Sequence, residues 1–235
     1  MELRGSVAII TGASKGIGRS IALQLASQGV HTVLAARNSE LLKELNSEIK
    51  ANGGSSIAVA ADVTSEHSVQ NLVIETIKHF GKVDILINNA GVGVFSNVVD
   101  MKVDDYETMM NVNLKGVFLC SRAVLPAMMK QKHGEIINIA SLAGKNSFAG
   151  GSVYSATKWG LIGFARSLML EVRDHNIRVV TISPGSVNTG FADKEGDRPD
   201  AIQPGDVADT VIFALTMPNR VNVSEIDVRP TMKPR

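Results

Sequence analysis

One stretch near the start of the chain decides the fold: Val7-Ala8-Ile9-Ile10-Thr11-Gly12-Ala13-Ser14-Lys15-Gly16-Ile17-Gly18. An apolar run passes through three glycines directly into a helical pattern. Such a turn lets the backbone approach a diphosphate group closely at a helix N-terminus. The glycine spacing is Gly-x-x-x-Gly-x-Gly, which differs from the Gly-x-Gly-x-x-Gly dinucleotide fingerprint. We therefore predict a dinucleotide-binding turn here; glycines that serve only close packing of the helix on the strand are the alternative.

Short runs rich in Val, Ile and Ala recur along the chain and alternate with longer helical patterns. Near-continuous apolar runs favour a parallel sheet that is buried on both faces, and the alternation predicts a doubly wound α/β fold. The predicted strands are Ser6–Thr11, Val30–Ala36, Ser56–Ala61, Val83–Asn88, Glu135–Ser141, Ile177–Ser183 and Glu225–Arg229. The predicted helices are Lys15–Gln28, Glu40–Asn52, Ser65–Phe80, Val103–Lys132, Ser152–Asn176 and Asp206–Thr216.

Length and composition indicate a single globular domain over residues 1–235. Hydrophobic residues make up 44% and charged residues 20%, which excludes a disordered chain and a coiled coil. We find no linker and no internal repeat. The polar stretch Asn188–Pro204 interrupts the alternation, and we expect it to be a mobile substrate loop over a site; an ordinary surface connection is the alternative.

Charge, cysteine usage and hydropathy exclude several classes of partner. Lys plus Arg number 24 against 23 Asp plus Glu, and without a clustered basic face we expect no nucleic acid. The single cysteine and the start Met1-Glu2-Leu3-Arg4, which has no signal-peptide pattern, favour a cytoplasmic protein. The longest stretch without a formal charge, Ser20–Ala36, is too short and too polar to span a membrane. The five histidines show no metal-ligand spacing, so we expect no metal site.

The end of the second predicted strand bears on cofactor choice. In dinucleotide folds an acidic residue there binds the ribose 2′-hydroxyl of NAD, whereas an arginine accommodates the 2′-phosphate of NADP. This strand ends Leu34-Ala35-Ala36-Arg37-Asn38, with a guanidinium and no carboxylate, and Lys15 can add a second positive charge. We therefore predict NADP(H) as the cofactor; two merely solvated cations are the alternative.

Further motifs follow in order: Asn88-Asn89-Ala90-Gly91, Ser141, Tyr154-Ser155-Ala156-Thr157-Lys158 and Pro184-Gly185. Together with the glycine turn, they make the chain closely resemble the short-chain dehydrogenase/reductase family over essentially its whole length. The resemblance implies a Rossmann-type fold with a seven-stranded parallel sheet and helices on both faces. It also implies hydride transfer between a nicotinamide and a carbonyl or alcohol.

The predicted catalytic group is formed by Asn113, Ser141, Tyr154 and Lys158. Tyr154 and Lys158 are four residues apart and share a helix face, so the ammonium is placed to lower the phenol pKa from its usual value of about 10. In reduction the same phenol donates a proton. The resemblance assigns Ser141 to the substrate oxygen and Asn113 to a water-linked proton path, with Asn111 as the competing candidate. A strand-end cap, a packed aromatic and a solvated lysine are the structural alternatives.

The resemblance also implies the cofactor contacts. It places Asp62 at the adenine amine, a loop carboxylate before a helix being the alternative, Asn88 and Gly91 beside the ribose and nicotinamide, and Thr189 at the carboxamide. The predicted cofactor-binding residues are Gly12, Ser14, Lys15, Gly16, Ile17, Gly18, Arg37, Asp62, Val63, Asn89, Ala90, Gly91, Tyr154, Lys158, Pro184, Gly185, Val187 and Thr189.

The residues expected around the substrate are nearly all apolar. No Arg or Lys stands immediately beside them, which favours ketones, aldehydes or secondary alcohols without an anionic group near the reacting carbon. Because the loop over the site is short, we expect an open pocket and loose specificity. The predicted substrate residues are Ser141, Leu142, Ala143, Phe148, Tyr154, Phe191 and Val94, with Val92, Gly93, Phe95 and Val187 as neighbours.

The leading hypothesis is an NADP(H)-dependent carbonyl reductase or alcohol dehydrogenase. Bacterial 3-oxoacyl-carrier-protein reductases share the motifs and are the runner-up, although Ser224–Pro230 stands where a Gly-Gly segment is common in them. A non-catalytic NADP(H)-binding sensor or scaffold is a third possibility. The helix over Tyr154–Val172 is apolar nearly all round, so we expect a homodimer or homotetramer.

Overall fold

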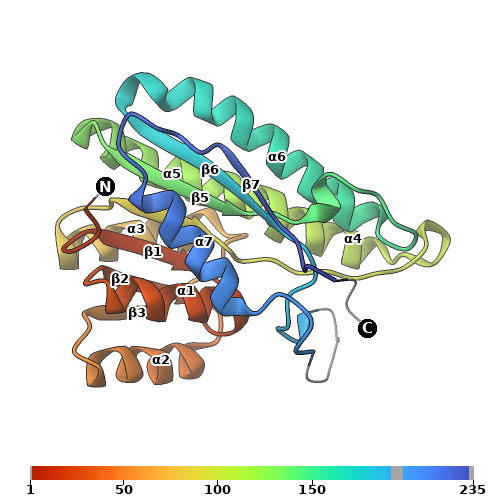
Figure 1. Cartoon of the computed structure of the whole chain (residues 1–235), viewed down its shortest axis with the longest axis horizontal. Helices are drawn as coiled ribbons and strands as arrows, with labels where there is room; N and C mark the ends of the chain where they lie inside the picture. The colour runs from red at the N-terminus through yellow and green to blue at the C-terminus, as the bar shows by residue number, and fades with distance from the viewer. Residues whose placement is uncertain (1, 192–197, 233–235) are drawn as a thin grey trace.

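The structure is a computed structural model, and it describes residues 2–191 and 198–232. Seven strands form one sheet in the order β3-β2-β1-β4-β5-β6-β7, and every neighbouring pair is parallel (Figure 1). The strands are β1 (Val7–Thr11), β2 (His31–Ala36), β3 (Ser56–Ala60), β4 (Ile85–Asn88), β5 (Gly134–Ile139), β6 (Ile177–Pro184) and β7 (Glu225–Val228). This arrangement confirms the predicted doubly wound parallel sheet.

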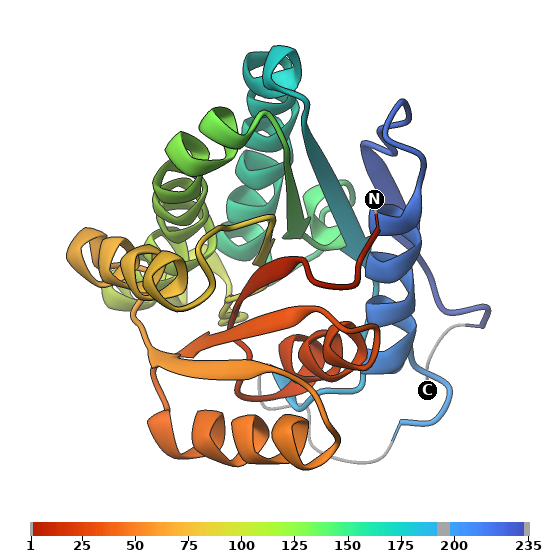
Figure 2. The same cartoon turned by 90° about the vertical axis from the view of Figure 1, so that its left-hand side faces the viewer.

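Helices cover both faces of the sheet. Figure 2, which looks at the sheet from one end, shows α1, α2 and α7 on one face and α3, α5 and α6 on the other. The helices are α1 (Gly16–Ser27), α2 (Ser39–Ala51), α3 (Glu66–Phe80), α4 (Val103–Met110), α5 (Gly116–Gln131), α6 (Ser152–Val172) and α7 (Pro204–Thr216). The short turns are η1 (Val98–Asp100), η2 (Asn111–Lys115), η3 (Leu142–Gly144) and η4 (Arg173–His175).

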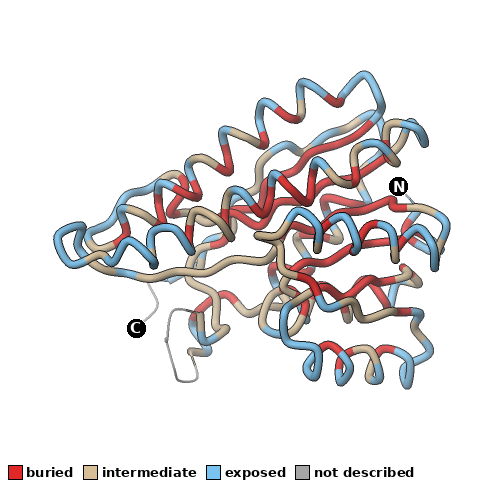
Figure 3. The backbone as a smooth tube through the Cα atoms, turned by 180° about the vertical axis from the view of Figure 1, so that it is seen from behind, coloured by how far each residue is buried: buried red, intermediate tan, exposed pale blue. Residues whose placement is uncertain are grey.

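The alternation of side chains along each strand divides the interior into two cores. In β1, Ala8 and Ile10 pack with α1, α2 and α7, whereas Val7 and Ile9 pack with α3, α5 and α6. Figure 3 shows the inner strands buried along their length and the helices buried where they meet the sheet. A strand that is covered on both faces has no solvated side, which explains the near-continuous apolar runs of the sequence.

The strand order fixes where a ligand can bind. β1 lies between β2 and β4, so the connections leave it in opposite directions and a crevice opens outside the carboxyl ends of these strands. The glycine turn, the segment Asn89–Gly91, Ser141 and Gly185 follow the carboxyl ends of β1, β4, β5 and β6, and Tyr154 and Lys158 lie at the start of α6. The fold therefore brings together segments that lie far apart along the chain.

One predicted helix is divided in the structure. The predicted helix Val103–Lys132 becomes α4, the π-helical turn η2 and α5. The described stretch Val103–Gln131 is long and apolar enough, by length and composition, to span a membrane, and 44% of its most apolar window is buried in the domain. Leu119 and Val124 of α5 pack with the sheet, which is the environment of a core helix.

Candidate functional site

A cavity of about 930 Å³ opens at the carboxyl ends of the strands. Residues that follow β1, β2 and β3 line one end of it, and residues that follow β5 and β6 line the other. The segment after β4, Asn89 to Gly93, lies between them. The cavity is thus located at the crevice that the strand order predicts.

The glycine turn between β1 and α1 forms the floor of the first end. Gly12 and Gly16 have φ angles of 65° and 57°, in the left-handed region that favours glycine. A Cβ on Gly12 would lie 2.9 Å from the Ala90 Cα, and a Cβ on Gly18 would overlap the Gly12 carbonyl oxygen. The turn therefore needs glycine at all three positions, but Gly18 is buried beneath the turn and does not line the cavity, in contrast to the prediction.

The first turn of α1 has free capacity for an anion. Within the described residues, its N-cap residue Lys15 makes no side-chain capping bond and its first turn holds no acidic residue. Backbone N–H groups at a helix N-terminus attract phosphate groups. The residues present therefore fit the diphosphate of a dinucleotide.

A side chain after β4 holds this turn in place. The Asn89 Nδ2 donates to the backbone oxygens of Thr11 and Gly12 at 3.0 and 3.2 Å. The Thr11 Oγ1 accepts from the backbone nitrogens of Asn89 and Ala90. Asn88, which we expected at the ribose, instead lies in the core and donates to Ser121 and Asn138 because it is the last residue of β4.

Three charged residues stand at this end of the cavity, Lys15, Arg37 and Asp62. Arg37 follows β2 and is exposed, and the next residue, Asn38, caps α2 with its side chain. The Asp62 Oδ1 accepts from the Thr64 backbone nitrogen at 2.9 Å and from its hydroxyl at 2.8 Å. These bonds, the backbone one above all, lower the pKa of Asp62, and Arg37 lowers it slightly further. Asp62 is thus both a turn-forming residue before α3 and part of the cavity wall.

The other end of the cavity holds the predicted catalytic group. Tyr154 lies in the first turn of α6, and its hydroxyl is near enough to the Ser141 hydroxyl for Ser141 to lower the pKa of the phenol. Ser141 follows β5, and its Oγ also accepts from the Ala143 backbone nitrogen at 3.1 Å, so it caps η3. Lys158 is buried beside the phenol, and its Nζ donates to the Ile139 carbonyl oxygen at 3.1 Å. The three side chains meet although two elements supply them.

Burial controls the protonation of this group. It raises the pKa of Tyr154, an effect that the neighbouring Ser141 hydroxyl only partly offsets, and it lowers the pKa of Lys158 to about 8. The expectation that Lys158 lowers the phenol pKa is therefore not met by the residues of the chain alone. The Lys158 Nζ lies 5.8 Å from the Tyr154 ring centre and is directed to a carbonyl, so the loss of solvent dominates. At neutral pH the phenol is protonated and is able to donate.

Asn113 lies outside the cavity and is completely buried in η2. Its Oδ1 accepts from the Val92 nitrogen, and its Nδ2 donates to the Val92 oxygen, both at 2.8 Å. The Nδ2 also donates to the Thr157 Oγ1, one residue before Lys158. Asn113 thus fixes the segment after β4 to α6, whereas its competitor Asn111 lines a separate surface groove. Interruptions of this π-helical kind are frequent at functional sites.

Placement of the remaining predicted residues is mixed. Apart from Gly18 and Asn88, every predicted cofactor residue lines the cavity. Of the predicted substrate residues, Val94 does not, because its backbone nitrogen and side chain turn toward Met109; Phe95 lines the cavity in its place. Sequence reasoning missed several lining residues. Asn38 and Ser186 stand just after β2 and β6, which was a usable signal. The others lie in α2, in η2 or after η3, where no such signal existed: Leu41, Val112, Asn146 and Ser147.

The substrate loop is described only in part, because residues 192–197 lie outside the described residues. Its base is closed by an isolated parallel bridge between Val187 and Ile202. The Arg198 guanidinium donates to the Ser186 hydroxyl at 2.7 Å. The predicted mobility of this loop stays a prediction.

Comparison with known proteins gives consistent matches. The family model for short chain dehydrogenases matches residues 6–200. An uncharacterized oxidoreductase of Listeria monocytogenes is 40% identical over the full length of both chains. A metagenomic short-chain oxidoreductase solved in complex with NADP is 41% identical with a TM-score of 0.88, and covers 99% of this chain and 100% of its own. An alcohol dehydrogenase of the archaeon Thermococcus sibiricus, complexed with 5-hydroxy-NADP, is 29% identical with a TM-score of 0.92, covering 98% and 99%.

Proposed function

Since the chain belongs to the short-chain dehydrogenase family of oxidoreductases, we propose that it transfers a hydride between NADP(H) and the carbonyl or secondary alcohol of a small, mainly apolar substrate. The observation that carries this proposal is the cluster of Tyr154, Ser141 and the buried Lys158 at the cavity wall, with the Lys158 Nζ 5.8 Å from the Tyr154 ring centre. A non-catalytic binding protein has no need for this group.

NADP(H) is supported at the first end of the cavity. Arg37 and Lys15 supply positive charge where a 2′-phosphate would lie, and the uncapped N-terminus of α1 would hold the diphosphate. The two related structures described above contain NADP and 5-hydroxy-NADP. When bound, the cofactor supplies the hydride and takes it back in the reverse direction.

The residues of the chain manage the proton. In carbonyl reduction the substrate oxygen accepts hydrogen bonds from the hydroxyls of Ser141 and Tyr154, which orient the carbonyl. As negative charge develops on that oxygen, the Tyr154 hydroxyl transfers its proton to it. The buried Lys158 ammonium then stabilises the phenolate that remains. The raised pKa of Tyr154 keeps the donor protonated at neutral pH, which favours reduction.

The proposal is tested by following absorbance of the reduced nicotinamide with NADPH and, separately, with NADH. The substrates are aldehydes, diketones, β-keto esters and an acetoacetyl thioester. We expect turnover with NADPH on simple ketones or aldehydes. A marked preference for the thioester would favour a 3-oxoacyl-carrier-protein reductase, and tight NADPH binding without turnover on any carbonyl would favour a sensor.

We further propose that the protein is a homodimer or homotetramer that associates through α5 and α6. A groove of about 510 Å³ between these helices is lined by Leu114, Phe118 and Phe164, among others. Trp159 and Leu170 of α6 are also 53% and 59% exposed, and large exposed apolar side chains are typical of interfaces. Light scattering at micromolar concentration is expected to give a multiple of 25.0 kDa, and a single 25.0 kDa species would contradict it.

A further inference from the structure

Two phenylalanine rings, Phe95 and Phe191, lie beside the Tyr154 phenol, and a third, Phe148, packs against Phe95. The Phe95 ring centre lies 5.4 Å from that of Tyr154 and 5.6 Å from that of Phe148, with interplanar angles of 85° and 75°. The Phe191 ring lies 5.9 Å from Tyr154 with an angle of 53°. The two Phe95 pairs are edge-to-face and the Phe191 pair is tilted, and all three distances are within the range in which aromatic rings attract one another. The rings come from three segments that follow β4, β5 and β6.

Two glycines allow these rings to pack directly against the backbone. A Cβ on Gly93 would lie 2.7 Å from the Phe191 Cε1 and 3.5 Å from the Phe95 Cζ, and a Cβ on Gly151 would overlap the Phe148 ring. Neither glycine has a positive φ, so the backbone turn does not require them. The missing side chains are needed only because rings lie against the backbone, which fixes where the rings stand.

The rings are also open to the cavity. Phe95 and Phe148 line it and remain 38% and 45% exposed. Charged residues among the described lining are restricted to Lys15, Arg37 and Asp62 at the dinucleotide end and to the buried Lys158. The described part of the substrate end thus offers aromatic surface and no charged partner for an anionic substrate.

We infer that this site selects carbonyl compounds that carry an aryl group beside the carbonyl, and that Phe95 is a specificity-determining residue for them. The inference rests on the proposed function. A flat ring seated beside Phe95 keeps its carbonyl next to the hydroxyls of Tyr154 and Ser141. A saturated ring of equal size covers the same apolar surface without the edge-to-face attraction.

The test uses acetophenone and cyclohexyl methyl ketone, which share one carbon skeleton and differ in aromaticity. The ratio of their kcat/KM values is measured with NADPH for the wild-type protein and for Phe95→Leu. Intrinsic reactivity of the two ketones cancels in the ratio of ratios. One aromatic pair corresponds to about 2- to 10-fold, so Phe95→Leu is expected to lower the aryl preference by that factor.

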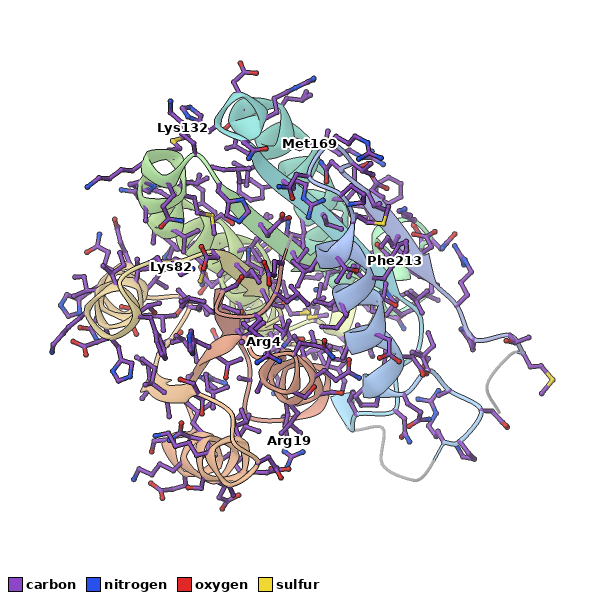
Figure 4. All side chains as sticks on the ribbon, turned by 60° about the vertical axis from the view of Figure 1, so that its left-hand side comes forward. Arg4, Arg19, Lys82, Lys132, Met169 and Phe213 are labelled. Atoms are coloured by element: carbon purple, nitrogen blue, oxygen red, sulfur yellow. The ribbon has the colours of Figure 1, made fainter. Side chains whose placement is uncertain are left out.

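Phe213→Leu is the matched control. Phe213 is 52% exposed on α7 and does not line the cavity (Figure 4), so this variant keeps the wild-type ratio. An equal loss on both ketones in Phe95→Leu would overturn the inference while leaving the proposed function intact. Absence of turnover with either ketone or any other carbonyl in the wild-type protein would count against the proposed function instead. If Phe95→Leu does not fold by circular dichroism, Phe148→Leu gives the same readout.

Discussion

At the dinucleotide end of the cavity the backbone itself forms the binding surface, whereas at the substrate end side-chain rings form it. Gly12 and Gly16 are held in left-handed conformations. The Asn89 side chain donates to the backbone oxygens of Thr11 and Gly12, and the Thr11 hydroxyl accepts from the Asn89 backbone nitrogen in return. At the substrate end Phe95 and Phe148 lie in loops and are half exposed. A change of residue at the first end alters the shape of the backbone, while a change at the second replaces one apolar surface with another.

The two ends of the cavity therefore determine specificity for their ligands in different ways. A turn that only glycine can adopt leaves few alternatives in the sequence. Rings in loops can be exchanged without moving the strands that carry the catalytic group. We therefore expect substitutions at the dinucleotide end to remove cofactor binding, and substitutions at the substrate end to change the choice of substrate.

Gly18→Ala gives the largest effect that we predict. Its Cβ would overlap the Gly12 carbonyl oxygen, so the turn must shift. Overpacking of this kind costs up to about 3 kcal/mol, and we expect the NADPH Kd to rise by roughly 100-fold in a fluorescence titration. Gly205→Ala on α7, where a Cβ meets nothing within 4 Å, is the control and leaves the Kd unchanged. An unaltered NADPH Kd in Gly18→Ala would contradict the view that the backbone of the glycine turn determines cofactor binding.

Arg37→Asp tests whether Arg37 sets the preference for NADPH over NADH. Loss of a hydrogen bond to a charged group costs about 1.5–3 kcal/mol, so the preference for NADPH over NADH in kcat/KM is expected to fall by roughly 10- to 100-fold. Arg4→Asp, before β1 at the opposite ends of the strands, keeps the preference (Figure 4). A wild-type protein that uses NADH as well as NADPH would show that Arg37 does not read the 2′-phosphate.

Lys158→Met tests the buried cation where the two ends meet. Burial lowers the pKa of Lys158 from 10.5 to about 8, so between these values the folded protein binds fewer protons than the unfolded chain. Wild-type stability therefore rises with pH from about 8 to 10.5, by about 3 kcal/mol from this group, and the variant lacks this rise.

At pH 7 the free energy of unfolding of the variant, measured by urea denaturation, is expected to be about 1–2 kcal/mol higher than that of the wild type. Removing the buried charge stabilises the fold, and loss of the hydrogen bond to the Ile139 oxygen offsets part of this gain. Activity is lost at the same time. Lys43→Met, which removes an exposed pair with Glu40, is the control with no such pH dependence. Parallel stability curves for wild type and Lys158→Met would mean that Lys158 is not desolvated.

Lys145→Met gives the smallest effect. The Lys145 Nζ lies 2.8 Å from both Glu225 and Asp227 of β7, and all three are partly exposed. Hydrogen bonds from Arg166, first, and from Lys145 lower the pKa of Glu225 to about 2. The stability that this group provides is present above the ordinary pKa of 4.5 and is lost as pH falls toward 2.

Because solvent screens these exposed ion pairs, we expect the free energy of unfolding of Lys145→Met to be about 0.5–1 kcal/mol lower than that of the wild type at pH 7. Its kcat is expected to stay close to that of the wild type. High salt should remove most of the difference between the two proteins. A large fall in kcat would show that β7 helps to position Ser141 through η3. In that case backbone elements, and not only side-chain rings, would shape the substrate end.

The sequence predicted what depends on residue type and spacing. The glycine turn, the strands and the pair Tyr154 and Lys158 needed only local rules, because helix spacing and strand ends fix their places. The choice between Val94 and Phe95 could not be made in this way, since alternation along a loop is not regular and Met109 decides which side chain turns inward.

Protonation was equally hidden from the sequence. The spacing of four residues places Lys158 on the same helix face as Tyr154. It does not reveal that both side chains are buried or that the Lys158 Nζ donates to the Ile139 oxygen. The role of Asn113 also depends on a tertiary contact, because its amide binds Val92, which is distant in sequence. Such effects follow from burial and become visible only in the folded chain.

The most direct test of the account is NADPH oxidation by Tyr154→Phe on a ketone that the wild-type protein reduces, measured beside the NADPH Kd of both proteins. General acid catalysis contributes about 100- to 10,000-fold, and the phenol hydroxyl is its only proposed donor here. We predict that turnover falls by at least about 100-fold while the Kd stays within about twofold. Turnover within a few-fold of the wild type, at equal cofactor binding, would contradict the role of Tyr154 as proton donor.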